Sequence, residues 1–135
     1  MLNTEPGVIR VLIVDDHPLM RKGLADILEG IDDIQVVGAA EDGAAALALA
    51  HAVKPDIVLM DISMPGMDGI EATEKLVEMG NSARVVMLTS YSEREKITQA
   101  LAAGAVSYLT KDSPPEAVIR AIRAAAITSD RRRAE

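Results

Sequence analysis

A chain of 135 residues, of which 49% are hydrophobic and 26% charged, is expected to form one soluble globular domain. It has no cysteine, which excludes disulfides, zinc–thiolate sites and cysteine nucleophiles, and no apolar run near the roughly 18 residues that a membrane span needs. A net charge of −7 has the wrong sign for binding a phosphate backbone, so action on DNA would need another part of the protein. The N-terminus lacks the layout of a signal peptide, and we expect a cytoplasmic protein without membrane contact.

The first half of the chain alternates β-branched apolar runs with patterns typical of helices. Buried strands are predicted over residues 8–15, 34–40 and 56–60. A helix is predicted after His17, with Pro18 at its first position, and a second helix from an Asp42 cap to about Ala52. The apolar stripe predicted for the first helix consists of Leu19, Leu24, Ile27, Leu28 and Ile31.

The second half continues the alternation after a loop of turn-forming residues. Helices are predicted over about residues 70–79, from the Ser92 region to residue 103, and from the prolines at 114 and 115 to about residue 127. Strands are predicted over residues 84–88 and 106–109. Ser92 and Glu95 have the spacing of a capping box for the fourth helix.

Five strands alternating with five helices predict an α/β fold, a parallel sheet with helices on both faces. In such sheets ligands bind beyond the carboxyl ends of the strands. The predicted ends of strands one, three, four and five carry polar side chains that a core does not require: Asp15, Asp16, Asp61, Thr89 and Lys111. We expect these side chains to form one site.

The predicted site has the composition of a phosphoryl-transfer centre. Three carboxylates at one edge repel one another unless positive charge is supplied, and Mg²⁺ prefers such oxygen ligands. Lys111 offers a cation and Thr89 a hydroxyl for phosphate oxygens. Asp61 is the candidate nucleophile, because it lies on the middle strand between the acidic pair and the Lys111 side.

Four segments carry a family resemblance: VLIVDDHPLMRKGL, DIVLMDISMPGMDGIEA, VVMLTSY and GAVSYLTKDSPPEAVIRAI. Together they resemble receiver domains of two-component response regulators, most closely those of the NarL/FixJ (LuxR-type) family, over about residues 9–127. The resemblance implies a flavodoxin-like (βα)5 doubly wound sheet with strand order 2-1-3-4-5. Asp112 follows the lysine where many receivers have proline, as is common in the NarL-like group.

The resemblance also assigns a role to each site residue. Asp61 would be the phosphoacceptor, phosphorylated by a sensor histidine kinase. Mg²⁺ would be bound by Asp16, Asp61 and the backbone carbonyl of Ser63, with Asp15 acting largely through a metal-bound water. Lys111 would pair with Asp61 and then with the phosphoryl group. The switch residues would be Thr89, which bonds a phosphoryl oxygen, and Tyr108, which rotates inward in response.

The implied protein is a signalling switch, not an enzyme, that controls transcription through a DNA-binding output domain. Residues 1–8 would be a tail, residues 9–128 the receiver, and residues 129–135 the start of a linker to a helix-turn-helix domain absent from this chain. We expect a homodimer on activation, and DNA contact only through that absent domain.

Two alternatives to this interpretation remain. A stand-alone receiver would pass its phosphoryl group onward or dock a protein partner. A phosphatase with an aspartate nucleophile would need a second acid two residues after Asp61, and Ser63 stands there.

Overall fold

The computed structural model describes residues 7–134, so the tail predicted over residues 1–8 lies mostly outside the described part. The strands are β1 (Ile9–Val14), β2 (Ile34–Ala40), β3 (Ile57–Asp61), β4 (Arg84–Thr89) and β5 (Ser107–Thr110). The helices are α1 (Pro18–Glu29), α2 (Gly43–Val53), α3 (Gly69–Glu78), α4 (Ile97–Ala103) and α5 (Pro115–Ala134), and a 3-10 helix, η1 (Tyr91–Lys96), precedes α4. The predicted strand bounds are therefore correct to within one residue. Within residues 7–134 no helix is both long and apolar enough to cross a membrane.

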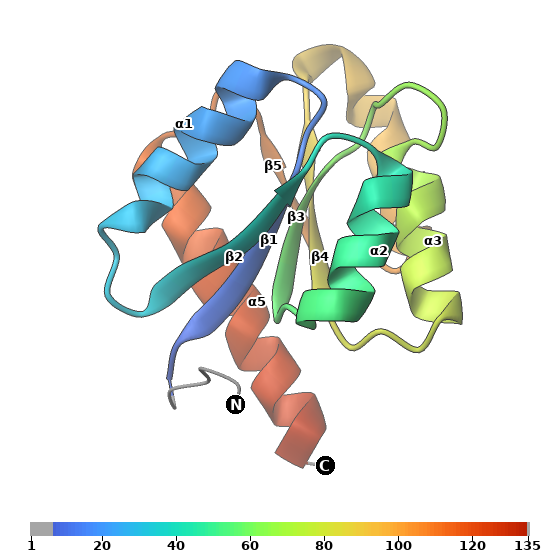
Figure 1. Cartoon of the computed structure of the whole chain (residues 1–135). Helices are drawn as coiled ribbons and strands as arrows, with labels where there is room; N and C mark the ends of the chain where they lie inside the picture. Colours follow the sequence, from blue (N-terminus) through green and yellow to red (C-terminus); the bar gives the residue numbers. More distant parts are fainter. Residues whose placement is uncertain (1–6, 135) are drawn as a thin grey trace.

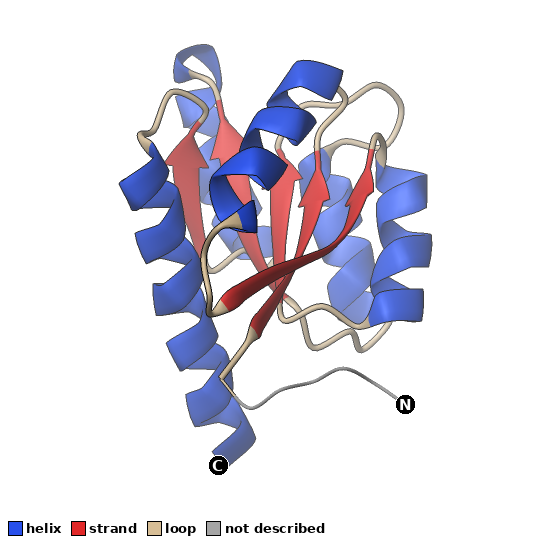
Figure 2. Ribbon diagram, turned by 60° about the vertical axis from the view of Figure 1, so that its left-hand side comes forward, coloured by secondary structure: helices blue, strands red, loops and turns tan. Residues whose placement is uncertain are grey.

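All five strands are parallel, and their order in the sheet is β2-β1-β3-β4-β5. Figure 1 shows α1 and α5 against one face of the sheet and α2 and α3 against the other. In Figure 2 the strand arrowheads point the same way, so the carboxyl ends of the strands share one edge. The flavodoxin-like, doubly wound α/β fold and its strand order are confirmed.

Alternate residues of the central strands pack against the two helical layers. Leu12 and Val14 of β1 belong to the core beneath α2, α3 and α4, whereas Val11 and Ile13 belong to the core beneath α1 and α5. All four are fully buried. Burial of such a side chain stabilises the fold by about 1.5–3 kcal/mol, and the two cores together fix where the carboxyl end of each strand lies.

The helix starts show which local signals in the sequence are sufficient. Pro18 occupies the first turn of α1, as predicted. The Asp42 side chain accepts a hydrogen bond of 2.8 Å from the Ala45 amide and caps α2, also as predicted. Asp68 caps α3 in the same way, through the Glu71 amide at 2.8 Å. Each cap satisfies an amide that the helix leaves unpaired.

The capping box before α4 differs from the predicted one. Ser90 and Glu93 form it, rather than Ser92 and Glu95. The Glu93 carboxylate accepts hydrogen bonds of 3.0 Å from both the amide and the hydroxyl of Ser90. Because β4 continues to Thr89, Ser90 is the first residue that is free to cap η1.

Two details of the predicted helices are also wrong. Leu19 is predicted on the buried stripe of α1, yet it is 84% exposed, because its position in the first turn leaves it in solvent. The last helix is predicted to end near Ile127 but continues to Ala134. The sequence after Ile127 offers no glycine or proline to stop it, and the side chains of residues 128–134 lie outside the described ones.

Gly69, the first residue of α3, allows the helix to start directly against the end of β3. A β-carbon at this position would overlap the carbonyl oxygen of Asp61 and lie 2.9 Å from the Ile62 α-carbon. The Gly69 amide donates to the Ile62 carbonyl at 3.1 Å. Because both obstacles are backbone atoms, a side chain cannot be accommodated by rotamer changes alone.

We therefore expect Gly69→Ala to lower the free energy of unfolding in urea by about 2–4 kcal/mol. Gly23→Ala is the matched control, since Gly23 is exposed inside α1 and a β-carbon there meets nothing within 4 Å. That control should gain about 0.5–1 kcal/mol from its higher helix propensity. Equal stabilities for the two variants would contradict the close approach of α3 to β3.

Candidate functional site

The site lies where β1, β3, β4 and β5 end at the common edge of the sheet. Asp15 follows β1, Asp61 is the last residue of β3, Thr89 is the last residue of β4, and Lys111 follows β5. The pairing of Val14 with Met60 and of Asp61 with Leu88 brings these ends to one level. The structure therefore brings together the strand ends that sequence reasoning selected.

Lys111 joins the two buried carboxylates of the site. Its Nζ lies 3.0 Å from Asp61 Oδ2 and 3.4 Å from Asp15 Oδ2. The side chains of Asp15 and Asp61 are fully buried, and that of Lys111 is mostly buried. Such pairs lose much of their hydration, so each charge depends on its partner.

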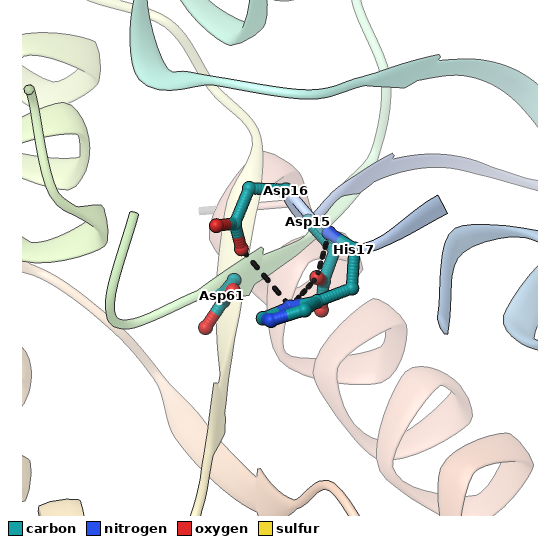
Figure 3. A group of neighbouring side chains, drawn as sticks. All are labelled: Asp15, Asp16, His17 and Asp61. Carbon is teal, nitrogen blue, oxygen red and sulfur yellow. Dashed lines mark hydrogen bonds and ion pairs between the residues drawn. The ribbon is translucent and has the colours of Figure 1, made fainter. Parts of the chain in front are cut away.

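The acidic cluster still has more oxygen acceptors than donors. Asp15 Oδ2, Asp16 Oδ1 and Asp61 Oδ2 are buried, and none accepts a hydrogen bond from the described residues, although each lies near a cationic or ring nitrogen. Ligand atoms of Asp15, Asp16, His17 and Asp61 all lie within 4.8 Å of one another (Figure 3). Buried, under-coordinated carboxylate oxygens at this spacing suit a hard divalent cation.

The electrostatics of the site oppose ionisation of Asp61. Burial raises the pKa of Asp61 to about 7, against the close approach of the Lys111 ammonium group and together with the negative charge of Asp15. For Lys111, burial would lower the pKa, but the close ion pair with Asp61 and the negative charge of Asp15 outweigh this effect, and the pKa of Lys111 is raised. The lysine is thus held as a cation, whereas Asp61 needs further positive charge to stay ionised at neutral pH.

Two side chains that sequence reasoning gave no role hold Asp15 in place. His17 donates its backbone amide to Asp15 Oδ1 at 2.8 Å, and its ring Nδ1 lies 2.9 Å from the same oxygen. Arg21 Nη1 donates to the Asp15 backbone carbonyl at 2.7 Å. Because Arg21 lies one helical turn after His17, helical spacing places both near the end of β1, and this signal was overlooked.

The remaining predicted residues occupy the rim of the site. The Ser63 amide donates to Asp61 Oδ1 at 3.2 Å. Thr89 is buried, and its hydroxyl donates to the Ser90 carbonyl at 3.1 Å rather than to Asp61. Tyr108 lies on β5 opposite Met87 and is 44% exposed. In this structure Thr89 and Tyr108 are therefore not joined to the carboxylates.

Comparison with known proteins agrees with this architecture. The response regulator receiver domain family matches residues 11–123. The transcriptional regulatory protein LiaR of Bacillus subtilis is 45% identical over 118 residues, which cover 87% of this chain and 56% of that protein. The nitrate/nitrite response regulator protein NarL of Escherichia coli is 40% identical over 126 residues, which cover 93% of this chain and 57% of that protein. The chain thus spans little more than half the length of these relatives.

A solved structure extends the similarity to the fold. The signal receiver domain of response regulator NarL from Mycobacterium tuberculosis superimposes with a TM-score of 0.85 at 39% identity, over 90% of this chain and 98% of that one. The family match covers most of the chain, and these relatives bear NarL names or regulate transcription. The chain belongs to the response regulator receiver domain family, and within it to receivers of the NarL/LuxR type.

Proposed function

We propose that the domain is switched by transfer of a phosphoryl group from a sensor histidine kinase to Asp61, with Mg²⁺ as cofactor. The observation that carries this proposal is the position of Asp61, buried at the end of the middle strand, with Lys111 Nζ 3.0 Å away and a second buried carboxylate beside that lysine. A carboxylate, a fixed cation and unsatisfied acidic oxygens are the groups that phosphoryl transfer to aspartate requires.

In the transfer, a carboxylate oxygen of Asp61 attacks phosphorus while the bond from phosphorus to the donor histidine nitrogen breaks. Lys111 is placed to neutralise charge on the phosphoryl oxygens as its bond to Asp61 weakens. Asp16, Asp61 and the Ser63 carbonyl are the residues that would bind Mg²⁺, with Asp15 behind them. When bound, Mg²⁺ supplies positive charge that favours the ionised form of Asp61 and draws the phosphoryl group in.

The switch would consist of a change of partner by Thr89. In this structure its hydroxyl is bonded to the Ser90 carbonyl, so it is free to turn only when a stronger acceptor arrives. A phosphoryl oxygen on Asp61 is such an acceptor. Tyr108 on the adjacent strand would then move inward from its exposed position, and the surface of α4, β5 and α5 would change.

For the whole protein we propose a cytoplasmic transcription regulator that dimerises on activation and binds DNA through a separate C-terminal domain. The names of its relatives, and the fact that the chain spans little more than half their length, support this proposal. The catalytic role is limited to the domain's own phosphorylation and dephosphorylation, because Ser63 stands where a phosphatase would need a second acid. A stand-alone receiver is the alternative, and the full coding sequence distinguishes the two.

Incubation with acetyl phosphate and Mg²⁺ tests the acceptor directly. We expect intact-protein mass spectrometry to show one added phosphoryl group, which Asp61→Asn and removal of Mg²⁺ each abolish. Asp68→Asn is the matched control on the same loop, because asparagine caps α3 as well as aspartate does. Phosphorylation of Asp61→Asn to the wild-type level would rule out Asp61 as the acceptor.

Thr89→Ala separates phosphorylation from the switch. We expect this variant to accept the phosphoryl group, because Thr89 makes no bond to Asp61 among the described contacts, but to lose the response at Tyr108. The chain has two tyrosines, so 3-fluorotyrosine labelling gives two ¹⁹F signals, and Tyr91→Phe assigns them. The Tyr108 signal should shift on phosphorylation of the wild type and stay in place in Thr89→Ala; a shift in both would contradict the coupling.

A further inference from the structure

The imidazole of His17 lies between the two acidic residues that follow β1. Its Nδ1 is 2.9 Å from Asp15 Oδ1 and 3.1 Å from Asp16 Oδ1, and Figure 3 shows the ring turned toward both carboxylates. Although His17 stands at the N-cap of α1, its side chain makes no capping hydrogen bond within the described helix. The ring is therefore held by the acidic pair and not by the helix that follows it.

These distances are those between neighbouring ligands of one metal ion. Two ligand atoms at about 2.1 Å from an ion lie about 3.0 Å apart at right angles and about 3.4 Å apart at the tetrahedral angle. The nitrogen lies near this spacing from each of the two oxygens, and Asp61 offers an oxygen within the same 4.8 Å cluster. The ring nitrogen thus stands where a ligand would stand.

A second observation, independent of His17, points to a ligand at this place. Asp15 and Asp61 are fully buried, and the Oδ2 atom of each accepts no hydrogen bond from the described residues. Lys111 approaches both of these oxygens but cannot satisfy the lone pairs of two carboxylates. The pocket therefore has carboxylate oxygens that could still bind a ligand.

We propose that His17 supplies a nitrogen ligand to this pocket and thereby gives it a preference for imidazole-binding transition metals, such as Zn²⁺, over Mg²⁺. Imidazole suits Zn²⁺, whereas carboxylate, carbonyl and water oxygens suit Mg²⁺. Ligation needs the ring proton on Nε2, and the ring is 65% exposed, so that nitrogen can be hydrated. Zn²⁺ imposes no geometry of its own and can adopt the arrangement that the four side chains offer.

This inference rests on the proposed function only in that it concerns the same acidic pocket. It adds a ligand and a class of metal that phosphorylation does not require. Mg²⁺ would use the oxygens alone and leave His17 aside. A transition metal would use the oxygens and the ring together, so the two ions should respond differently to loss of His17.

Isothermal titration calorimetry provides the test. It is run at about pH 8, because metal ligands bind only when they are deprotonated and protons compete less at this pH. We expect His17→Gln to weaken Zn²⁺ binding by tenfold or more and to change Mg²⁺ binding by less than about threefold. His51→Gln is the matched control: the chain has two histidines and no cysteine, and His51 lies exposed near the end of α2. Asp16→Asn should weaken both ions if they share this pocket.

An NMR measurement on the His17 Nδ1 atom itself complements the binding affinities. In protein labelled with ¹⁵N-histidine, Zn²⁺ should shift the Nδ1 resonance of His17 and leave the resonances of His51 unshifted. Mg²⁺ should shift neither. Equal losses of affinity for the two ions in His17→Gln, a gain for both, or an unmoved Nδ1 resonance would overturn the proposal. Phosphorylation of the wild type and of Asp61→Asn by acetyl phosphate and Mg²⁺ keeps the proposals separate, because that measurement reports on Asp61 and involves no Zn²⁺.

Discussion

The central constraint on the structure is the cluster of negatively charged side chains that is buried at the carboxyl edge of the sheet. Asp15 and Asp61 are fully buried, Asp16 lies beside them, and the partly buried Lys111 bridges the first two. In a low-dielectric surrounding these carboxylates cannot all ionise without added positive charge. Buried carboxylates with such a shortage of positive charge lower the stability of the fold, and strongly shifted pKa values of this kind are typical of functional sites.

The free energy of unfolding should change with pH in a definite direction because of this cluster. Because the pKa of Asp61 is raised to about 7 in the fold, the folded domain keeps a proton that the unfolded chain releases near pH 4. Between these values the unfolded state binds fewer protons, so the stability of the fold falls as the pH rises. The apolar cores on both faces of the sheet supply the stability that offsets this loss.

Most of the fold and the acidic site could be predicted from the sequence because their signals are local. The strands β1 and β3 are apolar, β-branched runs that lead directly into acids, and Asp42 caps the helix that it precedes. Ser90 and Ser92 both begin a Ser-x-x-Glu pattern, and only the length of β4 decides between them. That length is set by pairing with β3 and β5, which no local signal encodes.

The residues that were missed depend on tertiary position. Periodicity gave the direction of Leu19 on α1 but not whether the sheet reaches the first turn of that helix. His17 has the sequence context of an ordinary residue before a helix, and only the structure shows its ring against Asp15 and Asp16. Arg21 likewise reaches the Asp15 carbonyl through the geometry of the β1–α1 connection. The sequence thus names the charged groups, whereas the fold decides how they are paired.

The most direct test of the charge deficit is a titration of the Asp61 side chain itself. The carboxyl carbon of Asp61, assigned with Asp61→Asn, can be followed by ¹³C NMR from about pH 3 to pH 9, with and without Mg²⁺. We predict a midpoint near 7 without divalent cation and a clearly lower midpoint when Mg²⁺ is bound. A midpoint near 4 that Mg²⁺ leaves unchanged would show that the fold does not strain this carboxylate and would contradict the charge deficit at the site.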